Sequence, residues 1–228
     1  MLCPRGISSV IAFDTVTVRT PKSVLLSDIS FAVDTGEKAV ITGPSGSGKS
    51  TVLLTLMGAH APARGRVLFD GTEVTAQTVA SVRNAVAFIG QEPVLGNRSV
   101  REGLLLPFTF RANRGKRPGE QRISEILHGL KLSSDILDRS TAVISGGEKQ
   151  RIAVARALLT GKRIFVVDEI TSALDKAGNQ IVLDLFLRPD LTVLAVSHQA
   201  RWLEHFDKQI RIVNGTVAGV RHNRGGDT

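Results

Sequence analysis

The sequence has almost no cysteine and no long apolar run. Cys3 is the only cysteine among 228 residues, which excludes an intramolecular disulfide framework and a zinc site built from several cysteines. No apolar run approaches the roughly 20 residues of a membrane-spanning helix, and residues 1–9 lack the apolar core of a secretory signal. The remaining composition, 42% hydrophobic and 22% charged, is that of a globular chain with a hydrophobic core.

Aromatic residues are scarce as well, at 4% of the chain and with no tyrosine. Proteins that bind single-stranded nucleic acid stack bases on aromatic side chains, so this scarcity argues against such a role. The formal net charge of +8 nevertheless predicts a polyanionic partner. Nucleic acid, anionic lipid and nucleotide phosphates would each satisfy it.

Short apolar runs alternate with helical patterns along most of the chain. Alternating burial predicts antiparallel strands at Val10–Val18 and Ser30–Val33. Nearly continuous apolar runs predict buried parallel strands, with helices between them. These strands are expected at Ala39–Ile41, Ala85–Ile89, Ile164–Val167 and Leu191–Val196, and the helices at Lys49–Leu56, Arg122–Leu132, Glu148–Leu159 and Asp175–Leu187. The alternation predicts an α/β fold.

The order of these elements predicts a single domain over residues 1–220. Residues 1–92 and 160–220 would form the α/β core together with an N-terminal antiparallel β subdomain. Residues 93–159 carry mainly helical patterns and would form an inserted α-helical subdomain. Residues 221–228 are expected to be a disordered tail.

One motif predicts a phosphate-binding loop. Residues 43–50 read Gly-Pro-Ser-Gly-Ser-Gly-Lys-Ser and fit G-x-x-x-x-G-K-[ST] between an apolar strand and a helix. The glycines let backbone N–H groups surround a β-phosphate, while Lys49 supplies a cation and Ser50 a hydroxyl ligand for Mg²⁺. The expected nucleotide-binding residues here are Gly43, Pro44, Ser45, Gly46, Ser47, Gly48, Lys49, Ser50 and Thr51.

A second motif places two carboxylates at the end of a buried strand. Asp168 and Glu169 directly follow Ile164–Val167. A strand beside the phosphate loop would bring Asp168 to the magnesium ion and Glu169, as general base, to the attacking water. Two adjacent acids at a strand end are alternatively a solvated pair in a loop.

A third motif points to a family. Residues 144–151, Ile-Ser-Gly-Gly-Glu-Lys-Gln-Arg, open a predicted helix and resemble the LSGGQ signature of ABC ATPases. At a helix N-terminus Ser145 and the Gly147 amide can bind an anion, and the glycines, Gly146 included, allow close approach. The resemblance implies the RecA-like P-loop NTPase core of ABC ATPases.

The same resemblance implies roles for three further positions. Gln91 is similar to the Q-loop glutamine, which contacts Mg²⁺ together with Ser50 and Asp168. The segment 172–175 is similar to the D-loop, with Asp175 near the nucleotide, and His198 is similar to the switch histidine that contacts the γ-phosphate. The alternatives are that Gln91 is a surface glutamine, as a lone glutamine in a loop usually is, and that His198 is a solvated or packed histidine.

The family geometry implies a head-to-tail homodimer that encloses two ATP molecules, each held by one subunit's phosphate loop and by Ser145 and Gly147 of the other. Its closing and opening would drive a separate integral-membrane permease from the cytoplasmic face of the cell membrane. One feature departs from the family, because Thr15–Ser23 lacks the aromatic that stacks on adenine. Phe13 is expected in the core, and adenine would then rest on Val18, Arg19 or Pro21.

Several short strings are similar to the bacterial iron-efflux (Fet-type) ABC ATPases. They start at Ile41, Leu106, Gly147 and Asp168. This resemblance implies export of a metal ion such as iron. The alternatives are lipid, lipoprotein or small-solute transport, and a soluble ABC ATPase that acts on nucleic acid or ribosomes. The chain lacks the coiled coils, zinc modules and tandem cassettes of the soluble class, so nucleic acid is not the expected partner.

A basic segment follows in the predicted helical region. Residues 111–122 carry five basic residues against one acid, for a local charge of +4. Cytoplasmic leaflets are anionic, and each nearby basic residue contributes about 1 kcal/mol to membrane attraction. The segment therefore predicts contact with an anionic membrane surface, with a solvated loop as the alternative. The basic residues are Arg111, Arg114, Lys116, Arg117 and Arg122.

Overall fold

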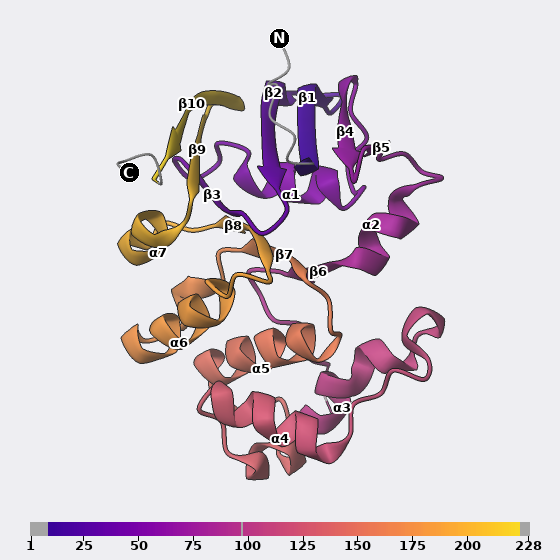
Figure 1. The fold of residues 1–228 in the computed structure, drawn as a ribbon, viewed down its shortest axis with the longest axis vertical. Helices are drawn as coiled ribbons and strands as arrows, with labels where there is room; N and C mark the ends of the chain where they lie inside the picture. The colour runs from indigo at the N-terminus through magenta and orange to yellow at the C-terminus, as the bar shows by residue number, and fades with distance from the viewer. Residues whose placement is uncertain (1–8, 97, 224–228) are drawn as a thin grey trace.

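Two β-sheets carry the fold in the computed structural model, which describes residues 9–96 and 98–223 (Figure 1). The first sheet is antiparallel, in the order β2-β1-β4-β5. Its apolar side chains alternate with polar ones, so one face packs into the core and the other meets solvent. The strands are β1 (Ser9–Arg19), β2 (Val24–Asp34), β4 (Arg64–Phe69) and β5 (Thr72–Glu73).

The second sheet is mainly parallel, in the order β10-β9-β3-β8-β7-β6. Its central strands are apolar throughout because both faces are covered, and every residue of β8 is buried. The four parallel strands predicted from the sequence are neighbours within it. The strands are β3 (Lys38–Thr42), β6 (Val86–Ile89), β7 (Ile164–Asp168), β8 (Thr192–Val196), β9 (Lys208–Val213) and β10 (Thr216–His222).

The expected disorder from residue 221 onward is wrong for its first three residues. Arg221 and His222 belong to β10, where they pair with Gln209 and Lys208 of β9, and the N–H of Asn223 donates to the carbonyl oxygen of Asp207 at 2.8 Å. The hairpin partner supplies the backbone hydrogen bonds that the isolated tail lacks. Residues 224–228 lie outside the described part of the chain.

The helices pack on both faces of the mainly parallel sheet. Helix α1 packs between the two sheets, where Val52, Leu53 and Leu56 are fully buried. Helices α3 and α4 pack on α5 at the end of the molecule opposite the antiparallel sheet (Figure 1). The helices are α1 (Lys49–Leu56), α2 (Val79–Ala85), α3 (Val100–Leu105), α4 (Glu120–Gly129), α5 (Gly146–Leu159), α6 (Lys176–Phe186) and α7 (Ala200–His205), with 3₁₀ turns η1 (Leu106–Thr109), η2 (Arg111–Asn113), η3 (Ser134–Asp138) and η4 (Ile170–Ala173).

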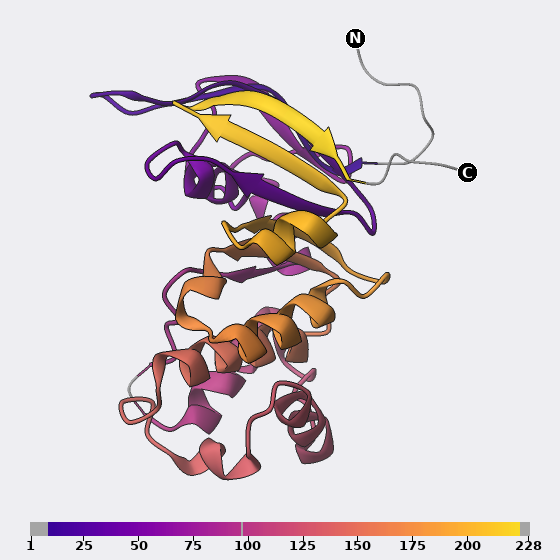
Figure 2. The ribbon, with the colours of Figure 1, turned by 90° about the vertical axis from the view of Figure 1, so that its left-hand side faces the viewer.

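This architecture confirms the α/β expectation with its added antiparallel sheet. Figure 2 shows β9 and β10 running beside the antiparallel sheet, and β10 contacts β2. Among the described residues, no helix combines the length and the apolar character needed to cross a bilayer. The parallel strands point their carboxyl ends to one edge of the sheet, which is where polar loops of this fold class gather.

Candidate functional site

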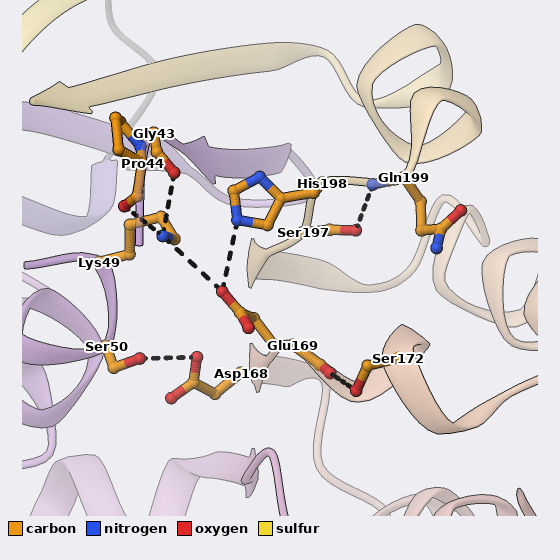
Figure 3. Close-up of polar contacts among 10 residues, drawn as sticks. All are labelled: Gly43, Pro44, Lys49, Ser50, Asp168, Glu169, Ser172, Ser197, His198 and Gln199. Carbon is orange, nitrogen blue, oxygen red and sulfur yellow. Dashed lines mark hydrogen bonds and ion pairs between the residues drawn. The ribbon is translucent and has the colours of Figure 1, made fainter. Parts of the chain in front are cut away.

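The predicted phosphate loop joins the end of β3 to the start of α1 (Figure 3). Gly43, Gly46 and Gly48 all have positive φ, which bends the backbone around the helix N-terminus. The Lys49 side chain is only 5% exposed, and its Nζ donates to the carbonyl oxygens of Gly43 at 3.0 Å and Pro44 at 2.9 Å. The ammonium group is therefore hydrogen-bonded to two neutral carbonyl oxygens of the loop. A phosphate oxygen is charged and would accept a stronger hydrogen bond from it.

Gly43 and Gly46 provide a matched pair of substitutions. A Cβ at Gly43 (φ 141°) would lie 1.9 Å from the carbonyl oxygen of Ile212 in β9, whereas a Cβ at Gly46 (φ 75°) would meet nothing within 4 Å. We expect Gly46→Ala to cost about 1–2 kcal/mol of unfolding free energy from backbone strain. Gly43→Ala should cost at least about 2 kcal/mol more, because the neighbouring strand must also shift. Urea unfolding of both variants measures this difference, and equal losses would contradict it.

Asp168 ends β7 beside the first turn of α1. The Ser50 hydroxyl donates to Asp168 Oδ1 at 3.0 Å. Burial raises the pKa of the Asp168 carboxyl, an effect that the Ser50 hydrogen bond opposes, the charge of Glu169 reinforces and that of Lys49 opposes. A second positive charge at this point would favour the ionised carboxylate.

A hydroxyl and a carboxylate form the donor set that Mg²⁺ uses when substrate phosphates and water complete its octahedron. Ser50 and Asp168 fit this role because their oxygens already lie within hydrogen-bonding distance. In the described part of the chain, no group of three or more His, Cys, Asp or Glu side chains could hold a metal by itself. The pair therefore fits a magnesium ion that arrives with a nucleotide.

Glu169 is the centre of the charged cluster in Figure 3. Its Oε1 lies 3.7 Å from Lys49 Nζ and 3.5 Å from Nε2 of His198, whose side chain is 55% exposed. Glu169 has a left-handed backbone with φ 45°, and its N–H donates to the carbonyl oxygen of Val196 in β8. Such a conformation costs a non-glycine residue about 1–2 kcal/mol, and strain of this kind concentrates at functional sites.

A cavity of about 560 Å³ opens beside this cluster. Its wall includes most of the phosphate loop together with Gln91 and Glu169, so Gln91 faces the space in front of Lys49. Sequence reasoning missed four other wall residues, which come from β2 and from the turn between β9 and β10. They are Val24, Leu25, Asn214 and Gly215.

The expected adenine platform is partly wrong. Phe13 is in the core as predicted, 3% exposed and stacked on Phe31 with ring centroids 4.7 Å apart. Val18, however, is only 1% exposed because its side chain points into the same core, and neither Arg19 nor Pro21 lines the cavity. The apolar wall is instead formed by Val24, which is 53% exposed, and Leu25. Nothing in the residue pattern identifies this valine, because its exposure depends on where β2 starts beside the phosphate loop.

The remaining predicted residues lie outside this cavity. Ser145 caps α5: its Oγ accepts from the N–H of Glu148 at 3.2 Å, and Glu148 Oε2 accepts from the N–H of Ser145 at 2.7 Å. Gly146 opens the same helix, and a Cβ at Gly147 would lie 3.2 Å from the carbonyl oxygen of Ala173 in η4. Asp175 caps α6 by accepting from the N–H of Gly178 at 2.7 Å.

Ser145 and Gly146 are exposed, so the helix N-terminus that they form faces solvent. The structure thus brings together the phosphate loop, Gln91, Glu169 and His198 on one side of the chain. It keeps Ser145 apart from them, next to the segment that leads to Asp175.

Comparison with known proteins identifies the family in which a phosphate loop, an acidic strand end and a separate Ser-Gly-Gly helix start occur together. A family model described as ABC transporter matches residues 26–172. The chain belongs to this family. It is an ABC ATPase domain.

The names of its relatives within the family give different transported substrates. The chain is 34% identical over 192 residues to the probable iron export ATP-binding protein FetA of Escherichia coli K12, covering 82% of this chain and 84% of FetA. It is 35% identical over 222 residues to the mycobactin import ATP-binding/permease protein IrtB of Mycolicibacterium smegmatis, covering 92% of this chain but only 38% of IrtB.

Among solved structures, a dimer of the ATP-binding cassette MJ0796 in a post-hydrolysis state with ADP and Pi has a TM-score of 0.84 to this chain. The two are 27% identical, and the match covers 95% of this chain and 100% of that cassette. That cassette thus holds its nucleotide as a dimer.

Proposed function

We propose that the chain binds MgATP and hydrolyses it in a head-to-tail dimer to drive a membrane permease. The observation that carries this proposal is the position of Glu169, whose carboxylate lies between Lys49 and His198 beside the Ser50–Asp168 pair. A carboxylate at this place can accept a proton from a water molecule that attacks the phosphate held by Lys49.

In this mechanism the phosphate loop positions the β- and γ-phosphates, and Lys49 leaves its carbonyl acceptors to neutralise them. Glu169 accepts the proton of water as the new O–P bond forms and the β–γ bond breaks, which yields ADP and inorganic phosphate. His198 orients Glu169 and contacts the γ-phosphate. Ser50, Asp168 and Gln91 would hold a Mg²⁺ ion, which would supply positive charge to the phosphates.

The second half of each site would come from another copy of the chain. Ser145 lies at an exposed helix N-terminus outside the cavity, so it is available to the γ-phosphate of a nucleotide bound to a partner subunit. Asp175 and its neighbours lie beside this helix and would form part of the same contact. We therefore assign Ser145, Gly146, Gly147 and Asp175 to the dimer interface.

We propose a permease on a separate chain as the partner and a metal ion such as iron as the cargo. The similarity to the iron export ATP-binding protein FetA over most of both chains supports this assignment. Lipid transport is the alternative, since a lipid A-core flippase of Xanthomonas axonopodis is 30% identical over 226 residues. In either case the chain would work at the cytoplasmic face of the membrane, where the basic residues 111–122 favour an anionic surface.

Nucleotide titration tests the proposed function. We expect ATP and GTP to bind within about a hundredfold of each other, because Val24 offers contact but no aromatic stacking or base-specific hydrogen bond. Val24→Tyr should tighten both by about 5- to 150-fold, since stacking contributes about 1–3 kcal/mol. Fluorescence competition measures both affinities. Failure to bind either nucleotide would overturn the proposed function, and a larger ATP preference would overturn this account of the base site.

A further inference from the structure

The turn between β9 and β10 brings Asn214 and Gly215 to the wall of the nucleotide cavity. Both residues have positive φ, 50° for Asn214 and 75° for Gly215, which a two-residue type I′ turn between antiparallel strands requires. None of the roles assigned above uses the Asn214 side chain. Its amide makes no hydrogen bond to any residue in the described part of the chain, so both its donor and its acceptor are open to a ligand.

Backbone contacts hold this turn against the phosphate loop and the first part of β2. The N–H of Gly215 donates to the carbonyl oxygen of Ser47 at 3.1 Å, and the carbonyl oxygen of Gly215 accepts from the N–H of Ser27 at 2.8 Å. Figure 2 shows the β9–β10 hairpin beside the sheet that contains β2, and β10 contacts β2. The backbone of Asn214 is therefore fixed relative to the loop that would hold the phosphates, which lowers the entropy cost of a contact from its side chain.

Asn214 belongs to the part of the cavity wall that we assign to the base. Gln91 and Glu169 line the part where the γ-phosphate would be hydrolysed, whereas Val24 and Leu25 form the apolar wall. The turn lies next to this apolar pair, because a Cβ at Gly215 would lie 2.8 Å from the carbonyl oxygen of Leu25. A nucleotide with its phosphates on the loop and its base against Val24 would therefore bring an edge of the base toward Asn214.

The geometry of the turn explains only part of the choice of residue at position 214. Asparagine, aspartate and glycine all tolerate positive φ at this place in a type I′ turn. The turn between β4 and β5 has the same length, with Asp70 (φ 48°) followed by Gly71, and it lies outside the cavity. A carboxylate at position 214 would repel the nucleotide phosphates, whereas an amide carries no charge and can both donate and accept a hydrogen bond.

We propose that the Asn214 amide hydrogen-bonds the edge of the purine base of the bound nucleotide. This inference rests on the proposed function, because it needs a nucleotide in the cavity. The amide presents an N–H donor beside an oxygen acceptor, so it can pair with N1 and the N6 amino group of adenine. After a rotation of 180° the same amide can pair with O6 and the N1–H of guanine. Asn214 would thus hold either purine, which agrees with the similar affinities expected for ATP and GTP.

Two substitutions of Asn214 test the proposal, with ATP and GTP affinities of the full chain measured by fluorescence competition. Asn214→Gly removes the amide but keeps a residue that the turn tolerates, and it should weaken both nucleotides at least about threefold. Asn214→Asp supplies two acceptors, which suit the N1–H and the N2 amino group of guanine but repel N1 of adenine. The ratio of GTP affinity to ATP affinity should therefore rise at least about tenfold. The effect of the added charge on the phosphates cancels in this ratio.

Asp70→Gly is the matched control. It removes a side chain from the corresponding positive-φ position of the β4–β5 turn, which does not line the cavity. Both nucleotide affinities of this variant should stay within about twofold of those of the unchanged chain.

Three results would overturn the proposal. Unchanged affinities in Asn214→Gly would mean that the amide makes no contact with the nucleotide. An unchanged affinity ratio in Asn214→Asp would move the contact to the ribose or the phosphates, which ATP and GTP share. Equal losses in Asn214→Gly and Asp70→Gly would reduce the effect to weakened turns. Nucleotide binding by the unchanged chain reports separately on the proposed function, which fails if neither ATP nor GTP binds.

Discussion

Glu169→Gln should bind ATP as the unchanged chain does and hydrolyse it about 10²- to 10⁴-fold more slowly. The amide keeps the shape of the side chain but cannot accept the proton of the attacking water. Binding should persist because the substitution removes a negative charge 3.7 Å from Lys49 Nζ, where the phosphates would lie. The closed dimer should then accumulate, since in the proposed mechanism hydrolysis is the step that opens it.

Phosphate release and sedimentation in the presence of MgATP measure the two effects. Glu204→Gln is the matched control, because it makes the same chemical change at an exposed position on α7 and should alter neither rate nor assembly. Turnover of Glu169→Gln at the unchanged rate would remove Glu169 as the general base.

Two inactive variants should restore activity when mixed. Lys49→Ala removes the cation of the phosphate loop, and Ser145→Arg blocks the exposed N-terminus of α5, so neither homodimer has an intact site. In a mixed dimer, the Ser145→Arg subunit supplies an intact phosphate loop and the Lys49→Ala subunit supplies an intact Ser145, so one of the two sites is complete. With random exchange, half of the dimers are mixed and each has one working site, so activity should return to roughly a quarter of the original.

The structure also provides the control for this experiment. Lys49 and Glu169 lie on the same side of the chain, 3.7 Å apart, so a mixture of Lys49→Ala with Glu169→Gln leaves no intact site in any dimer. This mixture should stay inactive. Restoration in both mixtures, or in neither, would contradict a site shared between Ser145 of one subunit and Lys49 of the next.

Much of the fold could be predicted because apolar patterning is local. The helix at Lys49–Leu56 and the buried strands beginning near Ala39 and Ile164 were placed to within one residue of their observed bounds. Other elements carry too little pattern to be found. All but one residue of β10 is exposed, so the strand depends on its hydrogen bonds to β9 rather than on burial.

The ends of helices are also poorly predicted where a partner distant in sequence fixes them. The helix predicted from Arg122 begins at Glu120, which is bonded to Arg101 on α3, and this partner is distant in sequence. The sequence pattern does predict the start of α5 at Gly146, since Ser145 and Glu148 have the spacing of a capping box.

The sequence by itself determined the chemistry of the site, because each motif is a run of neighbours whose function depends on local backbone geometry. Residues 43–50 form a loop at a helix N-terminus, and Asp168 ends a buried strand, wherever the rest of the chain lies. Only the tertiary structure decided how these pieces combine. Glu169 lies near His198 because β7 and β8 are paired neighbours in the sheet. Val24 lines the cavity because β2 starts beside the phosphate loop. Such distances are set by the order and hydrogen-bond register of the strands, which local patterning does not encode.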